Sequence, residues 1–372
     1  MERIVFVIGS LGSGGSELFL LWLVSTLAKE NYKVEIWTLT GGILEPSFRQ
    51  AGSLLEVGTK QEYSFIRKSL DILCLLKRLR NKYGNRNIVS PIICSFLPHS
   101  HVFVELFRLF GRRLGFTHLL FRRGRDFYFF KTVVGTLEKF LCNHEKCHYV
   151  GNSLVIKNDL LTNYPNSKKR IHMLINPVVE RFYYSKESRI KRENVVICVA
   201  NLIPYKNHIE LLQSFKLALK LGLPGDTRLI IVGEDRRNYK KVLEQKVKEL
   251  GIQSHVRFLG RRTDIDQLLF RSKIFCLLSK EEGSSNSLLQ AMAAGCICIT
   301  SPVGMAKEML LNGVTGYVSY DMQHIAYLIS HHLNNEDVKG IAENAHMRVA
   351  TYCSPLATIR QFKSILKLVE VS

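Results

Sequence analysis

The chain has 372 residues, 46% hydrophobic and 23% charged, which is typical of a folded protein of two domains with roughly 180 residues each. The formal net charge of +20 favours anionic partners such as nucleic acid, an acidic membrane face or phosphorylated substrates. Nine cysteines without a Cys-x-x-Cys pair argue against a zinc or dithiol redox motif and suit a reducing cytoplasm.

Short apolar runs alternate with amphipathic stretches, a pattern that predicts βαβ units. In the first half the expected strands are Arg3–Gly9, Lys33–Leu39, Ile88–Phe96, Phe116–Phe121, Cys147–Gly151 and Arg170–Asn176. In the second half they are Asn194–Ala200, Thr227–Gly233, His255–Leu259, Lys273–Ser279 and Cys296–Thr300. Helices are expected between them, for example at Asn207–Leu221, Tyr239–Leu250 and Asp264–Phe270, and the pattern after Ser319 is helical.

The polar, charged segment from Asn176 to Asn194 has little periodicity, and we interpret it as an interdomain linker. The predicted fold class is α/β, with two Rossmann-like, doubly wound domains facing across a cleft. They comprise residues 1–182 and 183–352, followed by a terminal helix, 353–372, that packs back on the first domain. In such sheets, ligands bind beyond the carboxyl ends of the strands.

No segment suggests membrane insertion. The N-terminus lacks the basic start and apolar stretch of a signal peptide. The longest apolar run, from Leu18 to Ala28, is about half the length that spans a bilayer. We therefore expect a cytoplasmic protein that is not integral to a membrane.

A glycine-rich turn follows the first predicted strand. Gly12, Gly14 and Gly15 allow the backbone to turn sharply, and a helix is expected from about Ser16, where free N–H groups attract a phosphate. The spacing is not G-x-G-x-x-G and no G-K-[ST] follows, so neither a dehydrogenase nor a P-loop is supported. A purely structural turn and an anion site both remain open.

Lys206 follows the first strand of the second half, just before a predicted helix. There its ammonium group could meet a diphosphate and stabilise charge that develops on a leaving phosphate. A solvated loop lysine is the alternative, since the chain has 52 basic residues.

Glu282 and Gly283 end a later strand-to-helix loop, and one residue of Ser284–Asn286 can cap the next helix. Asn286 and Gln290 are four residues apart and share a helical face. An acid before the helix and an amide one turn inside it could bind two sets of hydroxyls. A capped amphipathic helix without a ligand is the alternative.

The order of these segments resembles the retaining glycosyltransferases of family 4, the group 1 family, which have the GT-B fold. In the second half the resemblance rests on "VANLIPYKNH", "LIIVGED", "VRFLGRRTDI" and "LLSKEEGSSNSLLQAMAAGCICITSPVGMAKEMLLNGVTGYVS". In the first half it rests on "LGSGGSE", "YVGNSLVIKNDL" and "IHMLINPVVERF". The match is strong over about 130 residues of the second half and loose in the first.

The resemblance implies roles for these residues. Gly14 and Gly15 would approach the donor diphosphate and Lys206 would neutralise it, while Glu282 would hold hydroxyls of the donor sugar. Further residues near that sugar would be Gly283, Ser284 and Asn286. Gln290 stands at the second acid of the family's E-x7-E motif and would bind the ribose. The base would lie near Phe258, Leu259 and Gly260.

"CSFLPHSH" resembles the segment with the family's acceptor-side histidine, and His99 aligns better than His101. The implied catalytic residues are then Lys206, Glu282 and His99. No metal and no other cofactor is expected, and the nucleotide sugar is a co-substrate.

Two residues depart from the family pattern. Asn201 stands where the family commonly has an arginine that shares the diphosphate with the lysine, so a charge is lost unless Arg261, Arg262 or an arginine of the first domain compensates. Gln290 replaces a carboxylate and binds a ribose hydroxyl less strongly.

The resemblance implies a retaining transferase that moves a hexose or related sugar to a lipid-linked or saccharide acceptor in surface polysaccharide biosynthesis (capsule, O-antigen or lipopolysaccharide). A non-catalytic GT-B partner protein is the alternative, suggested by Asn201 and Gln290. A nucleic-acid-binding protein, suggested by charge, ranks last because no helix-turn-helix, zinc or RNP motif is present.

A basic, aromatic stretch runs from Val102 to Phe140, with eight basic and three acidic residues, a net of +5. Basic residues beside apolar ones suit an anionic bilayer surface. We expect peripheral contact with the inner face of the plasma membrane, while Phe116–Phe121 is expected to be core.

Overall fold

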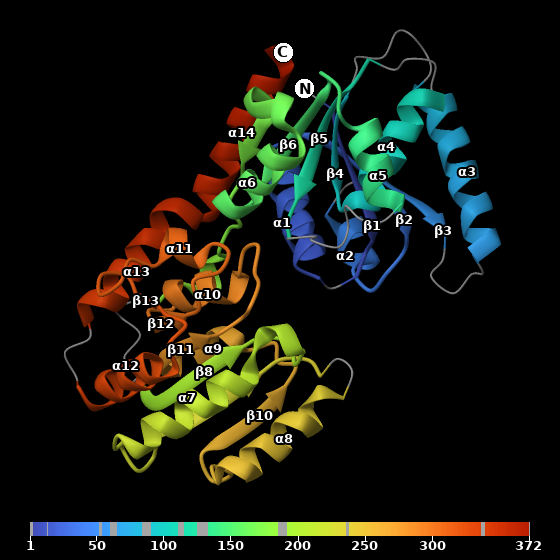
Figure 1. Ribbon diagram of the computed structural model, residues 1–372. Coiled ribbons are helices and arrows are strands. Elements are labelled where there is room, and N and C mark those ends of the chain that lie inside the picture. The colour runs from blue at the N-terminus through green and yellow to red at the C-terminus, as the bar shows by residue number, and fades with distance from the viewer. Residues whose placement is uncertain are drawn as a thin grey trace. The chain divides into compact units, whose positions relative to one another are not determined.

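The structure is a computed structural model that describes the residue ranges 3–12, 14–51, 54–59, 65–83, 91–110, 115–124, 133–184, 192–235, 238–335 and 339–371. Its contacts divide the chain into two units (Figure 1). The N-terminal unit comprises Met1–Leu174 and Ile359–Ser372, and the C-terminal unit comprises Ile175–Thr358.

The division between the units falls after Leu174, whereas the sequence predicts it after residue 182. Residues that follow Leu174 pack with the C-terminal unit, because Val178 and Phe182 are buried in that unit's core. The backbone N–H of Val178 also donates to the carbonyl of Cys353, at 2.7 Å.

The N-terminal unit is built on a parallel sheet of seven strands in the order β3-β2-β1-β4-β5-β6-β7. The strands are β1 Arg3–Ser10, β2 Lys33–Thr40, β3 Leu54–Thr59, β4 Ile92–Phe96, β5 Thr117–Arg122, β6 Cys147–Gly151 and β7 Ile171–Met173. The helices are α1 Gly15–Lys29, α2 Glu45–Gln50, α3 Phe65–Tyr83, α4 Pro98–Phe110, α5 Val133–Leu141, α6 Leu154–Asn163 and the 3-10 turn η2 Pro165–Arg170.

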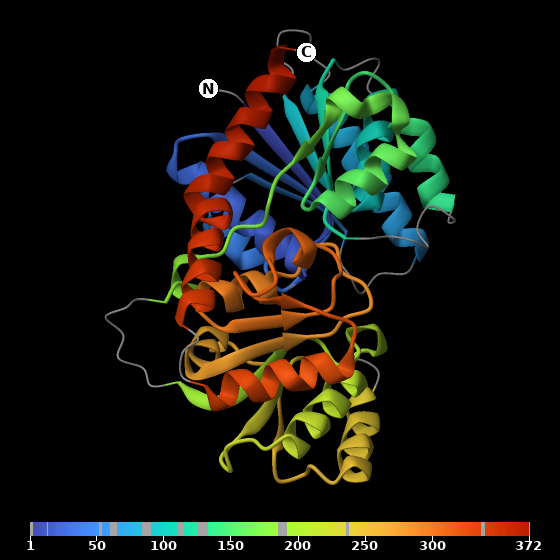
Figure 2. The ribbon, with the colours of Figure 1, turned by 60° about the vertical axis from the view of Figure 1, so that its left-hand side comes forward.

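Alternation along each strand sends side chains to two faces of this sheet. Ile4, Phe6 and Ile8 of β1 pack with α1, while Val5 and Val7 pack with α3 and α4. The last helix of the chain, α14 (Pro355–Val371), covers the α1 face (Figure 2). It inserts Phe362 against the rings of Phe6 and Phe121, whose centroids each lie 6.3 Å away. α14 is thereby part of the N-terminal core although it follows the C-terminal unit in sequence.

The C-terminal unit has a parallel six-stranded sheet in the order β10-β9-β8-β11-β12-β13. The strands are β8 Glu193–Val199, β9 Arg228–Val232, β10 Val256–Gly260, β11 Ser272–Leu277, β12 Ile297–Thr300 and β13 Tyr317–Val318. The helical segments are η3 Glu180–Phe182, η4 Pro204–Lys206, α7 His208–Lys220, α8 Tyr239–Leu250, α9 Ile265–Arg271, α10 Asn286–Ala293, α11 Ala306–Met309, α12 Met322–Asn334 and α13 Lys339–Cys353.

In each unit the first strand lies inside its sheet, so the strand order reverses beside it. β1 lies between β2 and β4, and β8 lies between β9 and β11. The loops that leave these neighbouring strands run in opposite directions and open a crevice at the carboxyl ends, the usual ligand position in doubly wound sheets. Both units are thus Rossmann-like, as the sequence predicts.

Among the described residues, no helix combines the length and the apolar character needed to cross a membrane.

Candidate functional site

Lys206 lies at the carboxyl end of β8, in the turn η4 that leads to α7. Asn207, with φ of 57°, adopts the left-handed conformation that asparagine tolerates better than most residues, and it ends η4 and begins α7. The Lys206 ammonium donates to Glu282 Oε1 at 2.5 Å. The two side chains are only 16% and 12% exposed. The structure therefore joins two residues that sequence analysis singled out separately.

Glu282 lies in the loop between β11 and α10 and is held from several sides. Its Oε1 also accepts from Ser279 Oγ at 2.8 Å. A Cβ at Gly304 would come within 2.8 Å of the Glu282 Cβ, so only glycine allows the loop after β12 to pack here. The Lys280 N–H donates to the Tyr205 carbonyl at 2.9 Å. The loops after β8 and β11 are thus tied together where the strand order reverses.

The start of α10 contains the three candidate capping residues, and Ser285 is the one that caps it. Its Oγ accepts from the N–H of Leu288 at 3.3 Å. Ser284 instead directs its hydroxyl to Met305 Sδ, and exposed Asn286 accepts from Asn176 Nδ2 at 2.5 Å. The positive end of the α10 dipole therefore lies next to Glu282.

Two further predicted positions lie elsewhere in this unit. Gln290 is half-buried on α10, one turn after Asn286. Phe258 is half-buried on the edge strand β10, followed by the exposed Leu259 and Gly260. β9 and β8 lie between β10 and β11, so Phe258–Gly260 at the end of β10, Lys206 after β8 and Glu282 after β11 follow one another along the carboxyl edge of the sheet. Gln290 lies beside this row on the helix after β11.

Asn201 is part of the backbone framework rather than a free polar group. Its Oδ1 accepts from the Glu234 N–H at 3.4 Å. The carbonyl of Ala200 lies 1.9 Å from where a Cβ of Gly233 would stand, so the loops after β8 and β9 touch and Gly233 must be glycine. Arg262, one candidate to replace the missing charge, instead forms an ion pair with Asp264 at 2.6 Å.

In the N-terminal unit, Gly14 caps α1 with extended backbone and Gly15 is its first residue. The Gly14 carbonyl accepts from Leu18 at 3.0 Å. A carboxylate oxygen of Glu17 lies 2.5 Å from where a Cβ of Gly14 would be, so that side chain occupies the space beside the helix start. Ser13 of the same turn lies outside the described residues.

The structure separates the two candidate histidines of α4. Leu97, with φ of 70°, links β4 to α4 in a left-handed conformation that is strained for a leucine. His99 is exposed in the first turn, whereas His101 is fully buried with Nδ1 3.1 Å from Glu138 Oε1. Burial lowers the pKa of His101 despite the neighbouring carboxylate. His99 is therefore the one accessible to a substrate.

The basic, aromatic stretch is only partly described, because residues 111–114 and 125–132 lie outside the described ranges. Phe116 and the apolar residues of β5 are buried, as the sequence predicts. By contrast, Phe110, Val133 and Phe140 are 57%, 78% and 82% exposed.

The residues that support the site carry little signal in the sequence. Asn176, Ser279 and Gly304 position Asn286 and Glu282, yet Asn176 and Gly304 contact them across long sequence separations. A local signal in the sequence was available for Gly304, because it follows the predicted strand Cys296–Thr300 at the edge where ligands are expected.

Two Rossmann-like parallel sheets, in each of which the strand order reverses beside the first strand, define a protein of the GT-B fold. Residues 180–348 of the chain match the sequence profile described as glycosyl transferases group 1. HepE from Anabaena, crystallised with UDP, has the same fold, with a TM-score of 0.82 at 20% identity over 99% of this chain and 100% of that one.

One relative is an α-1,4-N-acetyl-D-galactosaminyltransferase of Campylobacter jejuni, which is 25% identical to this chain over 94% of both chains. Its name gives as acceptor a GalNAc disaccharide on diNAcBac, linked through a diphosphate to undecaprenol. It is 32% identical to N-acetyl-α-D-glucosaminyl L-malate synthase of Bacillus anthracis, over 40% of each chain. Both names describe sugar transfer or glycoside synthesis.

Proposed function

We propose that the protein transfers a hexose or related sugar, with retention of configuration, from a nucleotide-diphosphate sugar to a lipid-linked or saccharide acceptor in surface polysaccharide biosynthesis. The observation that carries this proposal is the Lys206–Glu282 ion pair beside the capped start of α10, where the strand order reverses. The nucleotide donor is suggested by the UDP and UDP-glucose complexes of HepE. The acceptor class is suggested by relatives named for undecaprenol-linked saccharides.

Lys206 would stabilise the leaving diphosphate. An ammonium group has three N–H donors, and the bond to Glu282 uses one of them. The others can bind phosphate oxygens as negative charge develops on them during bond cleavage. The ion pair fixes the lysine in place beforehand, so little reorganisation is needed at the moment of reaction.

Glu282 would orient the donor sugar. Its Oε1 is used by Lys206 and Ser279, whereas Oε2 has no hydrogen bond within the described part of the chain and can accept from sugar hydroxyls. Gly283, Ser284 and Asn286 are the neighbouring residues that we assign to the same sugar. Gln290 would bind the ribose.

The length of the site suits such a donor. Strands in a sheet are about 4.8 Å apart, so Phe258–Gly260 on β10 and Glu282 after β11, three strands along, are roughly 14 Å apart across the sheet. A base at β10, a diphosphate at Lys206 and a sugar at Glu282 would fill that row in order. From the N-terminal unit we assign Gly14 and Gly15 to the diphosphate and His99 to the acceptor side.

The second candidate function is a non-catalytic GT-B partner, and Asn201 is the observation that favours it. Its side chain is engaged with the Glu234 backbone and brings no positive charge to the diphosphate. In the leading proposal, Lys206 and the start of α10 must therefore stabilise the leaving group without a second cationic side chain. The proposed reaction uses no metal ion and no other cofactor.

Differential thermal stability against UDP-, GDP- and ADP-sugars tests donor binding, with CMP-sugars as the single-phosphate comparison. A donor at 100 times its Kd stabilises the protein by about 2.7 kcal/mol. We expect one nucleotide-diphosphate sugar to raise the melting temperature of the wild type and of Lys280→Ala, an exposed lysine of the Glu282 loop, but not of Lys206→Ala. Turnover of that donor would exclude the non-catalytic alternative, and absence of any response would favour it.

We also propose that the protein acts at the inner face of the plasma membrane. Phe110, Val133 and Phe140 leave apolar surface exposed within a basic stretch, which suits an anionic bilayer. In liposome flotation, binding should rise with the fraction of anionic lipid and fall in Phe110→Asp/Phe140→Asp. Binding that does not depend on the fraction of anionic lipid would contradict this proposal.

A further inference from the structure

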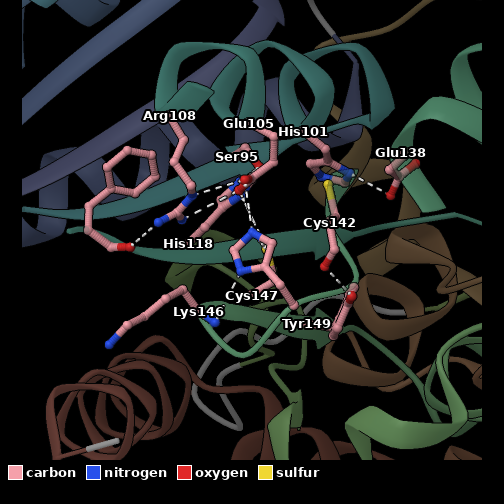
Figure 3. A network of polar contacts seen from close by, with 12 residues as sticks. Ser95, His101, Glu105, Arg108, His118, Glu138, Cys142, Lys146, Cys147 and Tyr149 are labelled. Atoms are coloured by element: carbon pink, nitrogen blue, oxygen red, sulfur yellow. Dashed lines mark hydrogen bonds and ion pairs between the residues drawn. The ribbon is translucent and has the colours of Figure 1, made fainter. Parts of the chain in front are cut away.

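A second cluster of polar and ionisable side chains lies in the N-terminal unit, at the amino ends of β5 and β6 (Figure 3). Glu105 projects from α4, His118 from the start of β5, and Cys147 from the start of β6, with His144 in the loop just before it. His118 and Cys147 are direct partners in the parallel register of β5 and β6. They therefore project from the same face of the sheet, at its amino edge, whereas ligands of doubly wound sheets bind at the carboxyl edge.

The potential ligand atoms lie close together. Cys147 Sγ is 3.4 Å from both Glu105 Oε1 and His144 Nε2, and 3.9 Å from His118 Nδ1. Glu105 oxygens lie 2.7 Å from His118 Nδ1 and 2.9 Å from His144 Nε2. The ligand atoms of Glu105, His144 and Cys147 all lie within 4.8 Å of one another.

We propose that Glu105, His118, His144 and Cys147 form a tetrahedral site for a structural zinc ion. With bonds of about 2.0–2.3 Å, tetrahedral ligands stand about 3.3–3.8 Å apart. The 3.4 Å distances from the sulfur to Glu105 and His144 already match this range, whereas the 3.9 Å distance to His118 needs to shorten slightly. The carboxylate–imidazole distances need to lengthen by less than about 1 Å. Four protein ligands leave no open position, which is the pattern of a structural rather than a catalytic zinc site.

The ligand types suit zinc by charge and by softness. A thiolate and a carboxylate balance the two charges of the ion, and imidazole and thiolate are the donors that zinc prefers. The thiolate is the form that binds metals.

Groups around the cluster orient it as the outer partners of a metal site do. His118 Nε2 lies 2.6 Å from buried Ser95 Oγ, which orients the ring with Nδ1 toward Glu105 Oε1 and Cys147. Arg108 Nε donates to Glu105 Oε2 at 2.9 Å, leaving Oε1 nearest the sulfur. His144 is 34% exposed and offers an entry path. Ligation through its Nε2 would give up the 3.3 Å contact between its Nδ1 and the Lys146 N–H.

The test is metal binding by the full chain after removal of metals with EDTA. We expect one equivalent of Zn²⁺ by elemental analysis and competition with a chromophoric chelator. Co²⁺ should give the intense visible bands of tetrahedral coordination together with a thiolate charge-transfer band. Cys147→Ser and His144→Gln should weaken affinity by more than about 100-fold, and Ser95→Ala by about 10–100-fold, as expected for an outer partner.

Cys74→Ser is the matched control, because this exposed cysteine lies on α3 and outside the cluster. It should keep wild-type affinity and the Co²⁺ charge-transfer band. His144→Gln, at a partly exposed position, keeps the test decisive if Cys147→Ser does not fold. Absence of stoichiometric binding in folded wild type, or binding unchanged in His144→Gln, would overturn the proposal and leave a hydrogen-bonded cluster. Neither result depends on sugar transfer.

Discussion

Two of the charge clusters in the described part of the chain differ in position and in number of partners. Lys206 and Glu282 form a pair at the carboxyl ends of β8 and β11, with one oxygen of the acid still available. Glu105 lies at the amino edge of the other sheet, and its two oxygens are shared among Arg108, His118 and His144.

This difference helps to distinguish residues that act in the reaction from residues that stabilise the fold. A buried charge must be compensated, and Glu105 is compensated by its own neighbours several times over. The Lys206–Glu282 pair is compensated once and keeps donors and an acceptor for a ligand. Removing Glu105 should therefore damage the fold, and removing Lys206 should damage the reaction.

The largest expected effect is that of Glu105→Ala on stability. The change leaves Arg108 and two imidazoles without their carboxylate in a site where Glu105 is 3% exposed. Breaking a buried ion pair from one side costs about 3–5 kcal/mol. Urea unfolding in metal-free buffer should report that loss in the N-terminal unit. The exposed Glu145→Ala should change the free energy of unfolding by less than about 0.5 kcal/mol; equal losses in both variants would contradict the framework role.

Lys206→Ala should act on turnover instead. Losing one preorganised group that stabilises the leaving charge costs about 10²–10³ in kcat, or about 2.7–4 kcal/mol of barrier. Steady-state kinetics with the donor found by thermal shift measures this, with Lys280→Ala as control. If Lys206→Ala kept its rate but melted earlier, the pair would be structural and the comparison would fail.

The fold was predictable because strands in the core carry continuous apolar runs. Two of the edge strands were harder to predict from the sequence. β3 and β13 were missed, since Leu54–Thr59 contains a glutamate and a glycine and Tyr317–Val318 has only two residues. Short edge strands are defined by their pairing with a neighbour, which local sequence does not encode.

The two charged regions also differed in how far the sequence predicted them. Lys206 and Glu282 each follow an apolar strand and precede a helix, so sequence and family resemblance both indicated them. Their direct ion pair, across 76 positions, was not predicted. Glu105, His118 and Cys147 are brought together only by the packing of α4 on adjacent strands, and the sole local signal was the His-x-x-Cys spacing from His144 to Cys147.

A third expected effect concerns acid stability of the C-terminal unit. Burial lowers the pKa of His208 and of His332 to about 4, below the ordinary value of 6.5. The unfolded chain binds these protons between pH 6.5 and 4 while the folded chain does not, so the stabilisation is full above pH 6.5 and is lost as pH falls toward 4. Each contributes on the order of 3 kcal/mol. The fall in melting temperature between pH 6.5 and 4 should be smaller in His208→Gln than in the wild type, and unchanged in the exposed His324→Gln. Identical profiles in the two variants would contradict the assignment of this acid sensitivity to His208.

The smallest expected effect, in Ser285→Ala, shows how far the α10 start takes part in the reaction. Its hydroxyl accepts from the Leu288 N–H, and losing such a cap costs about 1 kcal/mol of stability. The backbone N–H groups and the helix dipole remain in the variant, so kcat should fall less than about threefold, within the effect of one capping contact on the local field. Ser287→Ala, whose hydroxyl contacts Ser285 without capping the helix, is the control. A fall in kcat as deep as that of Lys206→Ala would mean that the Ser285 hydroxyl itself contacts the donor, and the site would then extend from the ion pair into the first turn of α10.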